Sequence, residues 1–160
     1  MKRLAVWFLL IFCISGSFAK ENTILLVRCD DIGMCHAVNV AAQELAETGI
    51  LLNYSIMFVC PWYQEAVDIL KDYDNVCFGI HLAVNSEWEN YRWGPCAVNT
   101  AVSSLTDEDG YFYPRMDMAY AADPSLEEIE AELRAQYRTG LAQRSGNPLL
   151  RYAYVNAGCP

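Results

Sequence analysis

The chain has 160 residues, of which 54% are hydrophobic and 12% aromatic, and its formal net charge is −9. This length suits one domain with a single core, and the apolar content excludes an intrinsically disordered chain. The acidic excess argues against nucleic acid and anionic membranes as partners, because a basic surface is needed to meet phosphate groups.

Residues 1–19 have the pattern of a secretory signal peptide. Lys2 and Arg3 form a basic start, residues 4–14 an apolar segment too short to span a bilayer comfortably, and residues 17–19 a small-x-small cleavage site. We therefore expect an exported protein, periplasmic or extracellular, with no membrane span after cleavage. Residues 20–160 then form one domain. An uncleaved anchor is the alternative.

Strand-like and helix-like segments alternate along the first half of the domain. Short apolar runs predict strands, and apolar residues on one helical face predict helices. We expect strands over residues 23–28, 53–59 and 75–84, and helices over 36–49 and 62–73. Because the connections are short, these elements predict parallel strands in right-handed βαβ units.

The alternation breaks after Asn85, where a long connection rich in Trp, Tyr, Gly and Pro begins. Ser125 and Glu128 then form a capping box, which predicts a helix start. We expect the buried stripe of that helix to consist of four residues, Leu126, Ile129, Leu133 and Tyr137. Residues 149–155 predict a fourth strand. Three or four such units form a small open α/β sheet and do not close a barrel.

The chain contains seven cysteines, and removal of the signal peptide with Cys13 leaves six. An even number in an oxidising compartment permits disulfides. However, Cys60 and Cys77 lie in apolar runs, where cysteine acts as a small hydrophobic residue. The absence of C-x-x-C spacing argues against a cysteine zinc site. We expect mostly free, buried thiols.

Asp30 and Asp31 end the first predicted strand, and His81 lies near the end of the third. Because the carboxyl ends of parallel strands share one edge of the sheet, these side chains can converge. Asp31 and His81 then suit a divalent ion such as Zn²⁺, Mg²⁺ or Mn²⁺, and Asp30 is available as a general base. The cation would also stabilise two adjacent carboxylates as anions.

Each of these residues also has an ordinary structural explanation. Paired aspartates before a helix are typical turn and N-cap residues, and Gly33 suits a tight turn in either case. His81 alone is more often a hydrogen-bonded residue at a strand end than a ligand. The conjunction of all three side chains at one edge favours the metal site.

Three stretches, "DDIGMCHAVN", "TGILLNYSIMFVCPWYQEAV" and "FGIHLAVN", resemble the YdjC-like carbohydrate deacetylases, which include chitooligosaccharide and hopanoid deacetylases. The resemblance runs from about residue 25 to residue 136. It implies a modified (β/α) barrel that removes an acetyl group from an amino sugar with a divalent metal ion, Mg²⁺ or Zn²⁺. It further implies Asp30 as catalytic base, Asp31 and His81 at the metal, and Asn39 as a conformational support.

The family carries a further histidine motif after the next strand, and residues 151–160, "RYAYVNAGCP", do not contain it. Asn156 stands near the expected acidic position, and no third metal ligand is found in the chain. His36 is a possible substitute, although a surface or helix-cap role suits it better. These departures predict a C-terminally truncated member in which the barrel is incomplete.

The aromatic residues of the long connection suggest a substrate surface. Trp88 and Trp93 can stack on a sugar ring and Arg92 can bind a polar substituent, whereas simple packing explains them equally well. The favoured function is metal-dependent deacetylation of an acetylated amino sugar, and the alternative is an inactive fragment or a non-catalytic carbohydrate-binding remnant. A NodB-like deacetylase, which also begins with paired aspartates, needs an H-x-x-x-H pair that the chain lacks.

Overall fold

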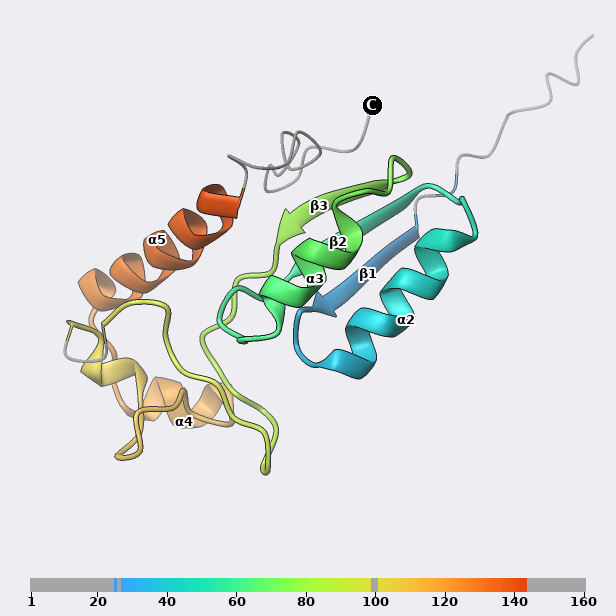
Figure 1. The fold of residues 1–160 in the computed structure, drawn as a ribbon. Coiled ribbons are helices and arrows are strands. Elements are labelled where there is room, and N and C mark those ends of the chain that lie inside the picture. The colour runs from blue at the N-terminus through green and yellow to red at the C-terminus, as the bar shows by residue number, and fades with distance from the viewer. Residues whose placement is uncertain (1–24, 26, 99–100, 144–160) are drawn as a thin grey trace, which may run out of the picture.

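The computed structural model describes residue 25 and residues 27–98 and 101–143 (Figure 1). The predicted signal peptide, the predicted strand over residues 149–155, and the residues Cys13, Asn156 and Cys159 lie outside the described residues. Those expectations therefore stay predictions.

The described chain is an α/β unit built on one parallel sheet. Its strands are β1 (Val27–Ile32), β2 (Leu52–Ile56) and β3 (Val76–Ile80), paired in the order β1-β2-β3. Its helices are α2 (His36–Glu47), α3 (Tyr63–Leu70), α4 (Met116–Ala121), α5 (Leu126–Ala142) and the short 3₁₀ helix η2 (Ser103–Leu105). The predicted α/β class with parallel strands is confirmed, and within the described residues the sheet is open, with three strands.

The strand ends differ from the predicted ones because pairing between strands, rather than apolar content, sets them. β1 extends to Ile32, past residue 28, and so includes both aspartates. β2 ends at Ile56: Met57 N–H still donates to the Ile32 carbonyl at 2.8 Å, but the chain then enters a turn in which Cys60 N–H donates to the Met57 carbonyl at 3.1 Å. The apolar residues 57–60 are buried in the turn that follows instead of continuing the strand.

Two apolar clusters hold the molecule together. The first lies between the sheet and helices α2 and α3, which Figure 1 shows side by side on one face of the sheet, and it includes the fully buried Leu52, Tyr54 and Leu70. The second lies under the long connection and includes Trp93 and Phe112. The connection that the sequence predicted as an irregular loop therefore packs on a core of its own, close to the carboxyl ends of the strands.

The most buried face of helix α5 is displaced around the helix from the predicted stripe, in which Ile129 and Leu133 are only half-buried. Leu126 is 79% exposed and Tyr137 is 43% exposed, whereas the buried residues of α5 are Glu132, Gln136 and Gly140. The missing side chain of Gly140 allows close approach to the sheet: a Cβ there would lie 2.9 Å from Phe58 and 3.1 Å from Ile80. This close contact decides which face of the helix is buried, in place of its apolar stripe.

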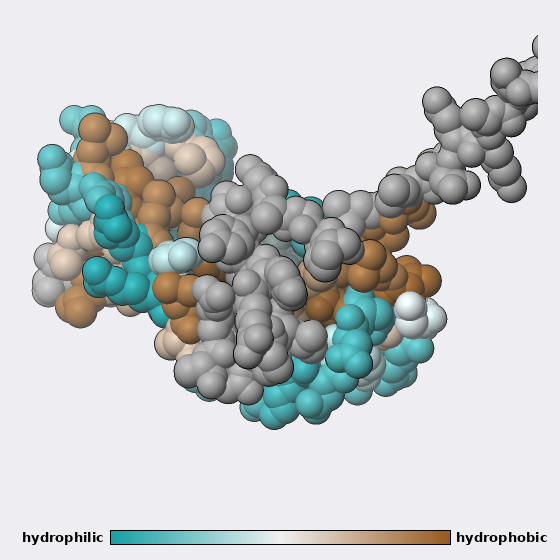
Figure 2. All heavy atoms as spheres, turned by 90° about the horizontal axis from the view of Figure 1, so that it is seen from above, coloured by the Kyte–Doolittle hydropathy of each residue, from teal (hydrophilic) through white to brown (hydrophobic). Residues whose placement is uncertain are grey.

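The predicted apolar stripe of α5 borders a groove of about 400 Å³. Leu126, Ile129, Leu133 and Tyr137 line it together with the charged Glu130 and Arg134. Figure 2 shows hydrophobic residues gathered toward the α4 and α5 end of the molecule, at the left of the view, with hydrophilic residues beside them. Within the described residues, no helix combines the length and the apolar character that crossing a bilayer requires.

Cys29, Cys35, Cys60 and Cys96 are free thiols, as expected, whereas Cys77 is disulfide-bonded, which corrects the expectation for that residue. Its apolar neighbours Val76 and Phe78 point into the core, and the alternation of a strand turns Cys77 to the other face. Burial raises the pKa of Cys60 to about 12 and that of Cys96 to about 11, so these two thiols are unreactive packing residues.

Candidate active site at the carboxyl ends of the strands

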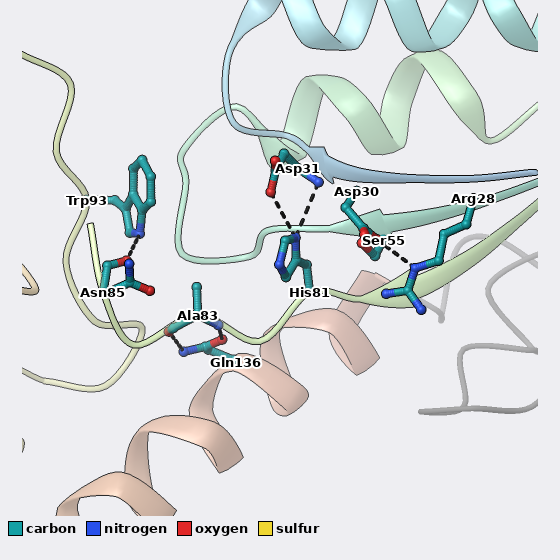
Figure 3. Close-up of polar contacts among 9 residues, drawn as sticks. All are labelled: Arg28, Asp30, Asp31, Ser55, His81, Ala83, Asn85, Trp93 and Gln136. Carbon is teal, nitrogen blue, oxygen red and sulfur yellow. Dashed lines mark hydrogen bonds and ion pairs between the residues drawn. The ribbon is translucent and has the colours of Figure 1, made fainter. Parts of the chain in front are cut away.

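The paired aspartates form a β-bulge. Cys29 pairs with Tyr54 and Ile32 pairs with Ile56, so that Asp30 and Asp31 together lie opposite the single residue Ser55. Asp31 has a positive φ of 64°, a left-handed conformation that aspartate tolerates better than most residues. Neighbouring side chains of a regular strand point to opposite faces, and a bulge re-aims one of them. Both carboxylates therefore reach the same edge of the sheet (Figure 3).

The Asp30 carboxylate is held by two donors that meet at one oxygen. Its Oδ1 accepts hydrogen bonds from Ser55 Oγ at 2.5 Å and from Arg28 Nε at 2.7 Å. The Ser55 bond, helped by Arg28 and by the nearby His81, outweighs partial burial and lowers the pKa of Asp30. The side chain is therefore ionised and oriented at neutral pH.

The importance of Ser55 can be measured directly. In Ser55→Ala the pKa of Asp30, followed by ¹³C NMR of its carboxyl carbon, is expected to rise toward the ordinary aspartate value, because the largest lowering contribution is lost. Ser86→Ala removes another buried serine hydroxyl, which binds Trp93 N–H at 2.9 Å, and is expected to leave that pKa unchanged. An unshifted Asp30 in Ser55→Ala would show that the hydroxyl does not control its charge.

His81 follows β3 directly and faces Asp31. Its backbone N–H donates to the Ile56 carbonyl at 2.9 Å, which continues the sheet pairing by one residue. The imidazole Nδ1 lies 3.2 Å from Asp31 Oδ1 and 3.3 Å from the Asp31 backbone nitrogen. The predicted convergence of Asp31 and His81, fifty residues apart in the chain, is present in the structure (Figure 3).

The Asp31–His81 pair fits a divalent cation as two of its ligands. A carboxylate oxygen and an imidazole nitrogen are donor types that Zn²⁺ binds, and the two side chains approach to 3.2 Å between Asp31 Oδ1 and His81 Nδ1. Among the described residues, no group of three or more His, Cys, Asp or Glu side chains gathers around such a position. His36 is engaged elsewhere, with its Nδ1 2.8 Å from Glu65 and its ring beside Trp62.

A pocket of about 350 Å³ opens beside this pair. Asp31, His81 and Trp93 line it, together with Met57, Leu82, Ala83, Val84, Asn85, Glu87 and Met116. Trp93 is almost fully buried, and its indole Nε1–H donates to the Asn85 carbonyl at 2.8 Å, which fixes the ring as part of the wall (Figure 3). The structure thus places one of the predicted substrate residues next to the predicted metal ligands.

Trp88 and Arg92 are not placed with Trp93 at this pocket. Trp88 is half exposed and lines a separate, open depression of about 660 Å³. The Arg92 guanidinium binds Asp107 at 2.5 Å and the Phe112 carbonyl at 2.9 Å, and it lies over the Tyr111 ring. These contacts tie the long connection to itself, so that the predicted substrate role of Arg92 competes with a structural one.

Asn39 supports the turn that carries Asp31. Its side chain is fully buried, and its Oδ1 accepts the Gly33 N–H at 2.9 Å. Its Nδ2 donates to the Trp62 carbonyl at 3.0 Å and to Glu65 Oε2 at 2.8 Å. The amide therefore joins the turn after β1 to the start of α3, in agreement with a conformational role.

Sequence reasoning missed two polar residues of this region, Ser55 and Gln136. Ser55 binds Asp30, and Gln136 binds the backbone of the pocket-lining residue Ala83. A register for β1 against β2 would have pointed to Ser55, but the sequence does not supply one. Gln136 lies among the polar positions of an amphipathic helix, where nothing distinguishes a buried amide from an exposed one.

Known proteins resemble this chain over most of its described length. A family model described as YdjC-like protein matches residues 24–148. A carbohydrate deacetylase of Brevibacillus brevis is 33% identical over 112 residues, which are 70% of this chain and 41% of the relative. A carbohydrate deacetylase of Thermus thermophilus is 36% identical over 113 residues, 71% of this chain and 37% of the relative.

A crystal structure of a candidate cellobiose-phosphate cleavage protein from Enterococcus faecalis V583 matches with a TM-score of 0.64 at 24% identity. The match covers 74% of this chain and 44% of that one, and it supports the fold. The chain thus spans less than half the length of each of these three proteins.

Proposed function

The chain belongs to the YdjC-like protein family, and on that premise we propose that it acts in the metal-dependent removal of an acetyl group from an amino sugar or oligosaccharide. The observation that carries the proposal is the bulge in β1. It brings an ionised Asp30 and its neighbour Asp31 to the edge of the sheet where His81 faces Asp31 beside an open pocket, and we propose Asp31 and His81 as metal ligands. Relatives named carbohydrate deacetylases support the same reaction class.

The proposed chemistry is hydrolysis of an amide. Asp31 and His81 would hold a divalent cation, Zn²⁺ or Mg²⁺, which when bound would supply a Lewis acid that polarises the acetyl carbonyl. Asp30 takes a proton from the attacking water, and its hydrogen bonds from Ser55 and Arg28 keep it charged and aimed. The C–N bond then breaks, the amine nitrogen gains the proton, and acetate and the free amino sugar leave.

The assay that tests the proposal is acetate release from N-acetylated oligosaccharides by the purified chain with added Zn²⁺ or Mg²⁺. Release that depends on the metal and saturates with substrate is the expected result. Absence of release at every metal concentration would contradict the enzymatic proposal for this chain. Carbohydrate binding without catalysis is the second candidate, favoured because the described residues supply two ligands of the proposed site rather than three.

Metal binding can be tested without substrate. A cation at about ten times its Kd is expected to stabilise the folded chain by about 1.4 kcal/mol, which raises the Tm by several degrees. His81→Ala is expected to abolish this rise, because one of two ligands is lost. His36→Ala, which removes a histidine bonded to Glu65 instead, is the matched control and should keep the full rise. An equal rise in both variants would place the ion elsewhere.

A further inference from the structure

Helix α5 directs two polar side chains into the protein interior. Glu132 and Gln136, one helical turn apart, are both fully buried. Burying such groups is costly unless each of them is hydrogen-bonded, and here both are. Glu132 Oε1 accepts from Cys96 N–H at 3.0 Å and from Gln136 Nε2 at 2.7 Å, and its Oε2 accepts from Ala97 N–H at 2.8 Å.

The Gln136 amide grips one residue of the site from both sides. Its Nε2 donates to the Ala83 carbonyl at 2.7 Å, and its Oε1 accepts from the Ala83 N–H at 3.1 Å (Figure 3). Two bonds to the same residue fix both the position and the rotation of the backbone there. Ala83 lies two residues after His81 and lines the same pocket. His81 therefore lies between two fixed points of the backbone, the end of β3 and Ala83, which Gln136 holds.

Glu132 determines which way the Gln136 amide points. Because its Oε1 accepts one hydrogen of the Gln136 NH₂ group, that group must face Glu132 and the Ala83 carbonyl, and the amide oxygen must face the Ala83 N–H. Close packing of Gly140 against Phe58 and Ile80 sets the distance of α5 from the sheet. Both the distance of the Gln136 side chain from the sheet and the orientation of its amide are therefore fixed.

We propose that Gln136 is a positioning residue, oriented by Glu132, that sets the His81 imidazole against Asp31 by holding the backbone of Ala83. The inference rests on the proposed function only in that the Asp31–His81 pair binds the metal. When no metal is bound, the hydrogen bonds from Gln136 to Ala83 still determine where the His81 imidazole lies. The position of the His81 ring is therefore the primary readout.

The test compares two variants of α5 in the full chain. Gln136→Met keeps the length of the side chain and removes both bonds to Ala83. Glu128→Gln weakens the other end of the helix, where the Glu128 carboxylate binds the Ser104 N–H at 2.8 Å and the Ser104 hydroxyl, and it leaves Ala83 untouched. Both variants are expected to lower the Tm, so stability alone does not separate them.

The separating measurements are the imidazole ¹⁵N shifts of His81 without metal and the Kd for Zn²⁺ by calorimetry. In Gln136→Met the His81 shifts are expected to change and the contact between its ring and the Asp31 amide to weaken, with a Kd raised by about tenfold, as for other residues that support metal ligands. In Glu128→Gln both should match the wild type. Unchanged His81 shifts in folded Gln136→Met would overturn the proposal.

Two further outcomes are informative. If Gln136→Met does not fold, Gln136→Glu replaces it in the test. This variant keeps the acceptor for the Ala83 N–H, loses the donor to the Ala83 carbonyl, and places a second carboxyl group against Glu132. The His81 shifts must change in Gln136→Glu, and unchanged shifts overturn the inference. If the wild type binds no Zn²⁺, the metal proposal fails. The His81 shifts of the variants still support or refute the positioning role in that case.

Discussion

Asp30→Asn is expected to lower the rate of acetate release by about 10²- to 10⁴-fold, the range that general bases contribute. Asparagine has the size of aspartate, and its amide oxygen can still accept from Ser55 and Arg28. The substitution therefore removes the proton acceptor while the shape of the site is kept. The measurement is kcat/KM on N-acetylated oligosaccharides at saturating Zn²⁺.

The control for this variant is its affinity for Zn²⁺, which should stay within a few-fold of the wild type, because Asp31 and His81 are intact. A loss of activity that is matched by an equal loss of metal binding would assign Asp30 to the metal rather than to proton transfer. An unreduced rate would remove Asp30 from the mechanism altogether.

Gly33→Ala is expected to have the largest effect on stability. Gly33 has a φ of 87°, and a Cβ there would lie 2.9 Å from the Tyr63 Cα, which is backbone at the start of α3 and cannot rotate away. The left-handed conformation alone costs alanine about 1 kcal/mol, and the overlap adds about 2 kcal/mol or more as the turn after β1 shifts. The free energy of unfolding, from urea titration, measures the sum.

Gly49→Ala separates the two contributions. Gly49 has a similar φ of 76° at the end of α2, and a Cβ there would have no other atom within 4 Å, so only the conformational cost of about 1 kcal/mol is expected. Equal losses in the two variants would show that α3 yields to the new methyl group. A larger loss in Gly33→Ala would show that the turn is clamped against α3, as the Asn39 bond to Gly33 also indicates.

The site was predictable in its members and not in its geometry. The order of strands and helices places Asp30, Asp31 and His81 at one edge, and this convergence is confirmed for Asp31 and His81. The bulge was not predictable, because the sequence of two aspartates at a strand end is the same whether the strand is regular or bulged. Only the partner residues on β2 reveal that two positions of β1 lie opposite one.

The orientation of α5 was predicted wrongly for a related reason. An apolar stripe normally marks the buried face of a helix. Here the loops at residues 83 and 96–97 present backbone amide and carbonyl groups that Glu132 and Gln136 satisfy, and Gly140 permits the close approach. Burial of these two polar residues depends on loops far away in the sequence, which no local pattern records.

The bulge gives β1 one residue more than β2 between two pairs of the sheet. That extra residue can be removed while the pairs on either side of it stay in place. Removal of one aspartate would leave a single acidic residue opposite Ser55 between the pairs Cys29–Tyr54 and Ile32–Ile56, which is the count of an uninterrupted parallel strand. The sheet would keep its register, and one of the two carboxylates would be gone. A single codon thus separates a regular parallel strand from one that brings two neighbouring carboxylates to the same edge of the sheet.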